Sequence, residues 1–178
     1  MAKHIALLRG INLGPSRRVA MADLRELCSE LGHEDVRTYV QSGNVVLTSK
    51  SKPERVARDL ERAIADKLGV ETDVIVRTRD DLAAVIERNP IREAVDDPKR
   101  YQVSFLSGEP DPDVVRELEG VDVAPERFVA SGREVYTWHP EGIQRSKLAK
   151  LLGDKRLGVT ATARNWNTVT KLLAMADS

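Results

Sequence analysis

Apolar and polar positions in the first half of the chain follow a pattern that predicts strands and helices in a defined order. Residues 3–9 are apolar almost throughout, which is typical of a strand covered on both faces. Residues 20–31 carry apolar side chains at helical spacing, and Gly32 follows as a stop signal. A hairpin at 36–47, a second helix and a strand at 72–77 complete the order βαββαβ, which is that of a ferredoxin-like split βαβ unit.

Local signals predict where the later helices of this half begin and end. Ser51 and Glu54 have the spacing of a capping box and predict the start of the second helix, and Gly69 predicts its end. Thr78 and Asp81 have the same spacing, so we expect them to cap a short third helix.

The pattern restarts after a connection that contains prolines. Residues 89–100 include Pro90 and Pro98, mixed charge and no apolar periodicity, so we interpret them as the link between two halves, 1–88 and 101–178. The second half repeats the order strand, helix, hairpin, helix. Its predicted elements are a strand at 101–107, a helix carrying Val114, Val115 and Leu118, a hairpin at 127–138, a helix at 145–152, a short strand near 157–160 and a final helix at 165–176.

A weak internal repeat supports this division into halves. Residues 36–47 read VRTYVQSGNVVL, and residues 125–136, 89 positions later, read PERFVASGREVY. Both segments look like two strands joined at a tight Ser-Gly turn, although Ser-Gly is common in turns and chance recurrence stays an alternative. The predicted fold class is α+β, with two similar ferredoxin-like βαββα(β) halves packed together and an extra C-terminal helix.

Composition narrows the class of protein without identifying a function. The chain has 178 residues, of which 41% are hydrophobic and 31% charged, as is ordinary for a folded protein. Aromatic residues make up only 4%, so few side chains are available to stack on bases. The net charge is zero, which argues against indiscriminate binding to nucleic acid, although residues 143–178 hold seven basic residues against two acidic ones.

The single cysteine bounds the redox and metal chemistry. Cys28 excludes an intramolecular disulfide, and it lies on the apolar stripe of the first helix, where a small core residue is favoured over a nucleophile. No Cys/His pairing has the spacing of metal ligands, so we expect no metal and no cofactor. The chain contains no long apolar stretch and leads from Met1 into a strand, so we expect a cytoplasmic protein without a signal peptide or a membrane span.

Three polar tracts are candidates for ligand binding. The first lies between the first strand and the first helix, where glycines allow backbone N–H groups to approach an anion and arginines can clamp a phosphate or carboxylate. It matches neither the Walker pattern nor the dinucleotide fingerprint, and a turn that needs positive φ at its glycines is an equal alternative. Its candidate residues are Arg9, Gly10, Asn12, Gly14, Arg17 and Arg18.

The second tract is the turn of the first hairpin. Ser42 and Gly43 are accounted for as turn residues, but Gln41 and Asn44 are amides that interrupt two apolar strands. Such side chains need hydrogen-bond partners. They satisfy either nearby backbone groups, which is the favoured interpretation, or a ligand.

The third tract is expected at the start of the last helix. Asn165 is a candidate N-cap, and Trp166 is in phase with the apolar stripe of that helix, which favours core packing over base stacking. Arg164, Asn167 and Thr168 would then lie near the positive end of the helix dipole, a position that suits an anion.

Several catalytic arrangements are absent from the sequence. There is no His-Glu-x-x-His motif, and Ser42 lacks the Gly-x-Ser-x-Gly elbow. His4, His33 and His139 are each placed where a structural or exposed role is favoured over that of a general base. An RNA-recognition motif shares the βαββαβ order, but the central strands here lack its aromatic stacking residues.

The segments LLRGINLG, MADLRELCSELG, VRTYVQSGNVVL and TATARNWNTVTKLL together resemble an uncharacterised bacterial family catalogued as domain of unknown function 1697. The resemblance covers nearly the whole chain and implies a cytoplasmic α/β protein of two similar halves. It supplies no established activity, so no catalytic residue can be transferred. Family members usually have a second glycine and an asparagine where this chain has Pro15 and Arg17, so its loop differs in backbone freedom and charge.

We hypothesise that the three tracts converge on one cleft that binds an anionic ligand, such as a nucleotide, another phosphorylated metabolite or a nucleic-acid end. Two alternatives stay open. One is a hydrolase or transferase that acts on such a phosphorylated substrate, and the other is a non-catalytic module for protein interaction or dimerisation.

Overall fold

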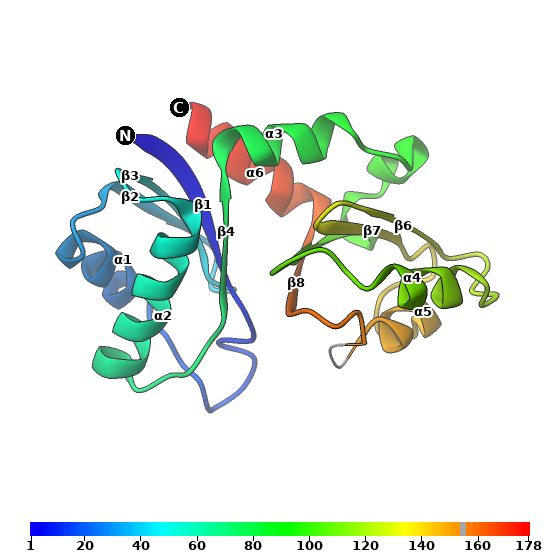
Figure 1. Cartoon of the computed structure of the whole chain (residues 1–178), viewed down its shortest axis with the longest axis horizontal. Coiled ribbons are helices and arrows are strands. Elements are labelled where there is room, and N and C mark those ends of the chain that lie inside the picture. The colour runs from blue at the N-terminus through cyan, green and yellow to red at the C-terminus, as the bar shows by residue number, and fades with distance from the viewer. Residues whose placement is uncertain (154–155) are drawn as a thin grey trace. The chain divides into compact units, whose positions relative to one another are not determined.

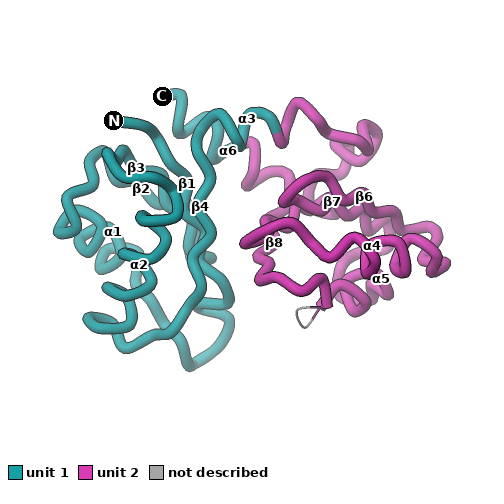
Figure 2. Tube along the Cα trace, viewed as in Figure 1, with its two compact units in different colours: residues 1–84, 171–178 teal, residues 85–170 magenta. Residues whose placement is uncertain are grey.

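The computed structural model describes residues 1–153 and 156–178 (Figure 1). These residues form two compact units. Unit 1 comprises Met1–Ala84 and Lys171–Ser178, and unit 2 comprises Val85–Thr170 (Figure 2). Each unit contains one four-stranded antiparallel sheet.

The sheet of unit 1 has the strand order β2-β3-β1-β4. Its central strand β1 is apolar from Ile5 to Leu8 and is hydrogen-bonded on both sides, as the continuous apolar run predicts. The four strands are β1 (Ala2–Leu8), β2 (Glu34–Tyr39), β3 (Asn44–Ser49) and β4 (Val74–Thr78).

Two helices cover one face of this sheet. Helix α1 (Met21–Glu30) and helix α2 (Pro53–Leu68) lie on the same side of the strands (Figure 1). Gly69 ends α2 in the left-handed conformation, as expected. The core between the helices and the sheet is aliphatic, because alternate strand residues meet the apolar stripes of both helices. It includes Ala6, Leu8, Leu24, Cys28, Val45, Leu47, Val56, Leu60, Ile64, Val74 and Val76.

Unit 2 repeats this topology with the strand order β6-β7-β5-β8. Its core is smaller and is built around Leu106, Leu118, Val135 and Leu157. The elements are β5 (Tyr101–Leu106), α4 (Pro112–Glu119), β6 (Arg127–Ser131), β7 (Glu134–Trp138), α5 (Lys147–Leu151) and β8 (Ala161–Asn165). The predicted fold class, α+β with two similar ferredoxin-like halves and a C-terminal helix, is confirmed.

Each half carries one helix beyond the βαββαβ order. Helix α3 (Arg79–Glu87) follows β4, and helix α6 (Trp166–Asp177) follows β8. As predicted, Thr78 and Asp81 form reciprocal hydrogen bonds at the start of α3. Asn165 is likewise the predicted N-cap of α6, because its Oδ1 accepts from the N–H of Thr168 at 3.0 Å. The C-terminal helix is therefore the counterpart of α3.

Strand registers show which positions of the two halves are equivalent. Arg77 pairs with Ile5 in the first sheet, and Arg164 pairs with Val103 in the second, so the two arginines occupy the same topological position. Both arginines are buried. Each donates from Nη1 to the carbonyl oxygen of the residue before it, at 3.3 Å for Arg77 and 2.9 Å for Arg164.

The repeated Ser-Gly dipeptides are not equivalent in the two hairpins. In the first hairpin Tyr39 pairs with Asn44 around a four-residue turn, whereas in the second Ser131 pairs with Glu134 around a two-residue turn. Ser131 therefore corresponds to Tyr39 rather than to Ser42. The halves share their topology, while a common origin by duplication stays a prediction.

Two local predictions are wrong. Lys52, not Ser51, is the N-cap of α2, because Pro53 occupies the first turn and fixes where the helix starts. Residues 157–160 do not form the last strand, which is β8 at Ala161–Asn165. The alternation of buried Thr162 and Arg164 with exposed Ala163 has the period of a strand.

The units also divide the chain differently from the predicted link at 89–100. Unit 2 begins at Val85 within α3, and the last part of α6 belongs to unit 1 (Figure 2). The predicted link contains two short 3₁₀ helices, η1 (Arg92–Asp96) and η2 (Pro98–Arg100). Neither has an apolar periodicity that sequence patterns could reveal.

The end of α6 is attached to unit 1 by basic side chains. Arg79 binds the Asp177 carboxylate through Nε at 2.7 Å and Nη2 at 3.0 Å. Arg37 donates from Nη1 to Ser178 Oγ at 2.7 Å, and Lys3 Nζ donates to the Ser178 carbonyl at 3.2 Å. These contacts explain why the final residues join a unit that is distant from them in sequence.

Gly43 lies where the first hairpin turn approaches the end of β1. Its φ is 87°, and a Cβ there would be 2.7 Å from Leu8 Cβ and 2.9 Å from Ile11 Cδ1. The carbonyl of Gly43 accepts the N–H of Leu8 at 2.9 Å. Glycine is required here for conformation and for space.

We expect Gly43→Ala to lower the free energy of unfolding by roughly 2–4 kcal/mol, because the added methyl combines left-handed strain with overpacking. Gly69→Ala is the matched control, since Gly69 has a φ of 67° with nothing within 4 Å of its Cβ position. Only the conformational cost of about 1 kcal/mol is expected there. Urea unfolding measures both variants, and equal losses would contradict the close-approach explanation.

Candidate functional site

The first two polar tracts meet in unit 1, and Asn12 joins them. Its Nδ2 donates to the Gln41 carbonyl at 2.8 Å and to the Val19 carbonyl at 2.9 Å, while its Oδ1 accepts the Val19 N–H at 2.9 Å. Asn12 has a φ of 55°, which asparagine tolerates better than most residues. Its amide therefore holds the loop between β1 and α1 against the hairpin turn.

Arg17 closes the same loop from the other side. Its Nε donates to the Gly10 carbonyl at 2.9 Å, and its Nη2 donates to the Arg9 carbonyl at 3.4 Å. The Arg17 carbonyl in turn accepts the Asn12 N–H at 3.0 Å. Gly10 has the positive φ expected of a turn glycine, at 64°, whereas Gly14 does not belong to the positive-φ residues. The guanidinium of Arg17 is thus held in place by backbone oxygens.

The amides of the hairpin turn have different environments. Asn44 is fully buried, and its Nδ2 donates to the Tyr39 carbonyl and to Ser42 Oγ, both at 2.9 Å. The interpretation that Asn44 satisfies nearby groups of the turn is therefore supported. Gln41 is exposed and contributes its backbone carbonyl to Asn12.

The third tract lies in unit 2 and adopts a different structure from the one expected. Arg164 is inside strand β8 rather than at the start of a helix, because the strand continues to Asn165. Its side chain is buried, and Nη1 donates to Thr162 Oγ1 at 2.8 Å. Burial lowers the pKa of Arg164 to about 10, so it remains a cation at neutral pH.

The rest of this tract belongs to α6. Trp166 is buried and stacks on Tyr101 with ring centroids 5.0 Å apart, which confirms the predicted packing role. Thr168 is buried and donates its N–H to Asn165, while Asn167 is exposed. A cleft shared by all three tracts stays a prediction, since the third tract and the first two belong to separate units.

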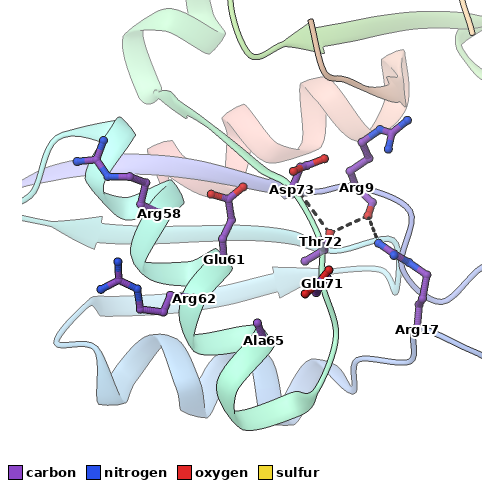
Figure 3. A pocket seen from close by; sticks show the side chains of 9 residues that line it. All are labelled: Arg9, Arg17, Arg58, Glu61, Arg62, Ala65, Glu71, Thr72 and Asp73. Carbon is purple, nitrogen blue, oxygen red and sulfur yellow. Dashed lines mark hydrogen bonds between the residues drawn. The ribbon is translucent and has the colours of Figure 1, made fainter. Parts of the chain in front are cut away.

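A hollow of about 590 Å³ opens in unit 1 next to the first tract (Figure 3). Helix α2, the loop after β1 and the segment leading into β4 form its walls. Figure 3 shows Arg58 and Arg62 on α2 at one side, Arg9 and Arg17 at the other, and carboxylates between them. The lining residues are Arg9, Arg17, Arg58, Glu61, Arg62, Ala65, Glu71, Thr72 and Asp73.

Hydrogen bonds hold the segment before β4, which forms one wall of the hollow. Thr72 is buried and donates its hydroxyl to the Arg9 carbonyl at 2.7 Å, and the Arg9 N–H donates to the Asp73 carbonyl at 3.0 Å. Glu61 accepts the Val74 N–H through Oε2 at 3.1 Å. These contacts place Glu71 and Asp73 on the open side, because they flank the buried Thr72 in an extended segment.

Arg58 and Arg62 are the accessible cations of the hollow. Both are exposed and lie four residues apart on α2, so their side chains are neighbours on one helix face. Within residues 1–153 and 156–178 neither guanidinium forms a hydrogen bond or an ion pair. In contrast, Arg55 on the same helix pairs with Asp59 at 3.6 Å.

Arg9 and Arg17 are candidate residues predicted from the sequence, whereas the residues of the opposite wall were not predicted. Arg58 and Arg62 are ordinary charges on an amphipathic helix, and such charges usually form a solvated face. The sequence feature that could have indicated this pair is the four-residue spacing of Arg58 and Arg62, which places them on one helix face. Thr72 and Asp73 had no signal, because only pairing of β1 with β4 brings them beside Arg9.

A separate polar network in unit 2 is buried. His139 Nδ1 lies 2.7 Å from Glu126 Oε2, and its Nε2 lies 2.9 Å from Thr137 Oγ1. Ser146 Oγ donates to the same Glu126 oxygen and accepts the Ala149 N–H at 2.8 Å. The order hydroxyl, imidazole, carboxylate is that of a nucleophile with its base, but Thr137 and His139 are buried. The network joins β7 to the start of α5.

Residues 1–153 and 156–178 contain neither a metal-binding cluster nor a membrane-spanning helix. No group of three His, Cys, Asp or Glu side chains there is placed to hold a metal ion. In the same part of the chain, no helix combines the length and the apolar character that crossing a bilayer requires.

Comparisons with known proteins agree with this fold and assign no activity. A family model described as "Protein of unknown function (DUF1697)" matches residues 1–136. A solved structure of a conserved bacterial protein, SP0830 from Streptococcus pneumoniae, is similar with 25% sequence identity and a TM-score of 0.79, and the match covers 98% of each chain. None of the curated proteins matches the sequence.

Cys28 is expected to be unreactive in the folded protein. It is fully buried, and burial raises the pKa of its thiol to about 12, so little thiolate exists at pH 8. We expect a chromogenic disulfide reagent to label Cys28 only at the rate of unfolding, and to label it rapidly in urea. Rapid stoichiometric labelling of the native protein would contradict this description.

The Glu126 network is expected to make stability depend on pH. Burial alone would raise the pKa of Glu126, but hydrogen bonds from Ser146 Oγ and the Leu148 N–H, together with His139, outweigh it and hold the pKa below its ordinary value of 4.5. A depressed carboxyl pKa stabilises the fold above the unfolded value, and this contribution is lost as the pH falls through the folded pKa. The difference in unfolding free energy between wild type and Glu126→Gln should therefore be constant above about pH 5.5 and should shrink below about pH 4.5.

The size of this difference at neutral pH should be roughly 1–3 kcal/mol, since hydrogen bonds to a charged group are lost. Glu141→Gln provides the control, because Glu141 is an exposed carboxylate of the same unit. Urea unfolding between pH 3.5 and 8 measures all three proteins. A difference that does not change with pH would rule out the proposed titration.

Proposed function

The chain belongs to the family of proteins of unknown function DUF1697, whose description assigns no activity, and from the hollow in unit 1 we propose that it binds a phosphate-bearing anion. A nucleotide, another phosphorylated metabolite or a nucleic-acid end provides such a group. The volume of about 590 Å³ lies within the range of roughly 300–1,000 Å³ found for small-molecule sites.

The observation that carries the proposal is the pair Arg58 and Arg62 on α2. Like charges four residues apart on a helix repel one another and cost a few tenths of a kcal/mol. In the described residues neither guanidinium forms an ion pair with a carboxylate. A phosphate bound between them would relieve the repulsion and accept charge-assisted hydrogen bonds from both side chains.

Arg17 adds a preorganised cation on the opposite wall. Backbone carbonyls of Gly10 and Arg9 accept from its Nε and Nη2, so its guanidinium is already oriented before a ligand arrives. Preorganisation lowers the entropy cost of binding. The first tract thus contributes to the proposed site through Arg9 and Arg17, and Gln41 and Asn44 contribute indirectly through the turn that Asn12 holds.

The proposal concerns binding and not turnover. The residues that line the hollow include no histidine, cysteine or serine, so neither an imidazole base nor a nucleophile of these types faces it. His4 and His33, the histidines of unit 1, are both buried. The alternative of a hydrolase or transferase has no observation in its favour.

Binding can be tested with inorganic pyrophosphate and ATP as probes, by isothermal titration calorimetry at low ionic strength. We expect Arg58→Ala and Arg62→Ala each to weaken binding about tenfold or more, since each removes a charge-assisted hydrogen bond worth roughly 1.5–3 kcal/mol. Rising salt should also weaken binding, because the site is open to solvent.

Arg55→Ala is the matched control, because Arg55 is an exposed arginine of α2 that does not line the hollow. The affinity of the Arg55→Ala variant for pyrophosphate and ATP should equal that of the wild type. The proposal fails if neither probe binds, or if Arg55→Ala weakens binding as much as the variants of the hollow.

A further inference from the structure

The three carboxylates of the hollow need an explanation that a bare phosphate site does not give. Glu61, Glu71 and Asp73 lie between the two arginine pairs (Figure 3). Four arginines against three carboxylates leave the lining close to neutral, and each carboxylate repels an anion. A site selected only for phosphate would be stronger without them.

We infer that the ligand carries hydroxyl groups beside its phosphate, as a phosphorylated sugar does, and that Glu71 and Asp73 accept hydrogen bonds from those hydroxyls. This inference rests on the proposed function. It assigns the arginines to the phosphate and the carboxylates to the sugar. A carboxylate that receives a ribose hydroxyl is a known way for proteins to recognise the sugar of a nucleotide.

The two carboxylates are available for this role. Glu71 and Asp73 are exposed, and among the described residues their side chains form no hydrogen bond or ion pair. Glu61 differs, since one of its oxygens accepts the Val74 N–H at 3.1 Å. It therefore supports the segment before β4, on which Glu71 and Asp73 are carried.

The backbone beneath these carboxylates is firmly held. Thr72, between them, is buried and donates its hydroxyl to the Arg9 carbonyl at 2.7 Å, and the Asp73 carbonyl accepts the Arg9 N–H at 3.0 Å. The same short segment thus ties the acceptors to the strand that carries Arg9. A fixed spacing between cations and acceptors can distinguish a ligand that has both groups.

The same charges disfavour an extended polyanion. A nucleic-acid strand would bring several phosphates to the hollow, and those beyond the arginines would face carboxylates. No aromatic side chain lines the hollow, so the stacking that holds bases, roughly 1–3 kcal/mol each, is missing. The chemistry recognised is therefore a single phosphorylated sugar, with little discrimination between attached bases.

The test compares ribose 5-phosphate, 2-deoxyribose 5-phosphate and inorganic phosphate by calorimetry. We expect the wild type to bind the ribose compound about 5–10-fold more tightly than the deoxy compound, which corresponds to about one hydrogen bond. This preference should shrink towards onefold in Asp73→Ala or in Glu71→Ala, whichever removes the acceptor of the 2-hydroxyl, and a preference unchanged in both variants would contradict the inference. Inorganic phosphate should bind these variants more tightly than the wild type, because a repulsive charge is gone.

Asp66→Ala serves as the control, because Asp66 is an exposed carboxylate of α2 outside the hollow. Its ribose preference and phosphate affinity should be unchanged. Thermal unfolding verifies that each variant is folded, and both carboxylate variants are measured because the 2-hydroxyl can be accepted by either side chain.

The outcomes separate this inference from the proposed function. If phosphate binds through Arg58 and Arg62 but the ribose and deoxyribose compounds bind equally, the sugar inference is wrong and the anion site stands. If an oligothymidylate binds far more tightly than the sugar phosphates, the ligand is a nucleic acid and the inference is overturned. If no phosphate compound binds, the proposed function itself is wrong.

Discussion

The structure of the candidate site depends on the close approach of the first hairpin turn to the end of β1. Gly43 is within reach of Leu8 because it has no side chain, and its carbonyl accepts the Leu8 N–H at 2.9 Å. Asn12 then donates to the Gln41 carbonyl of the same turn. These contacts order the loop that carries Arg17 and set the position of Arg9, so two of the four arginines of the hollow depend on a glycine outside it.

The two halves show how one topology accommodates different sites. Arg77 and Arg164 are buried at equivalent positions of β4 and β8, so this feature belongs to the shared frame. The connections differ. In unit 1 the loop between β1 and α1 contributes Arg17 to the arginine hollow and is hydrogen-bonded to a four-residue turn, whereas the turn of unit 2 has only two residues. Loops on a common frame are where proteins usually differ in function.

Two groups of charged side chains, one in each unit, differ in how far they are exposed to solvent. In unit 2, His139 is buried and Glu126 is half-buried, and their hydrogen bonds are made within the protein. In unit 1, Arg58, Arg62 and Asp73 are exposed around an open hollow, and their charges are not matched by one another. Buried polar groups without partners are costly, while exposed ones remain solvated until a ligand replaces the water. The buried set accordingly serves stability, and the exposed set is the one available to a ligand.

The elements and their order follow from local patterns of apolar and polar residues, so they could be predicted from the amino-acid sequence. The apolar run of β1, the cap at Thr78 and the stop at Gly69 act through neighbouring residues, and all three were read correctly. Local patterns failed at the strand containing Arg164, because its buried residues Thr162 and Arg164 are polar, and at Pro53, which overrides the capping signal of Ser51.

Which polar residues lie together in the candidate site follows from long-range contacts of the folded chain. Arg9, Arg17, Arg58 and Asp73 are brought together by the pairing of β1 with β4 and the packing of α2 on the sheet, and the sequence pattern does not reveal which exposed charges become neighbours. Likewise, Thr72 helps to hold one wall of the hollow because its hydroxyl donates to the Arg9 carbonyl. The physical reason is that apolar periodicity specifies which face of an element is buried, whereas the surroundings of an exposed charge depend on contacts between segments far apart in the chain.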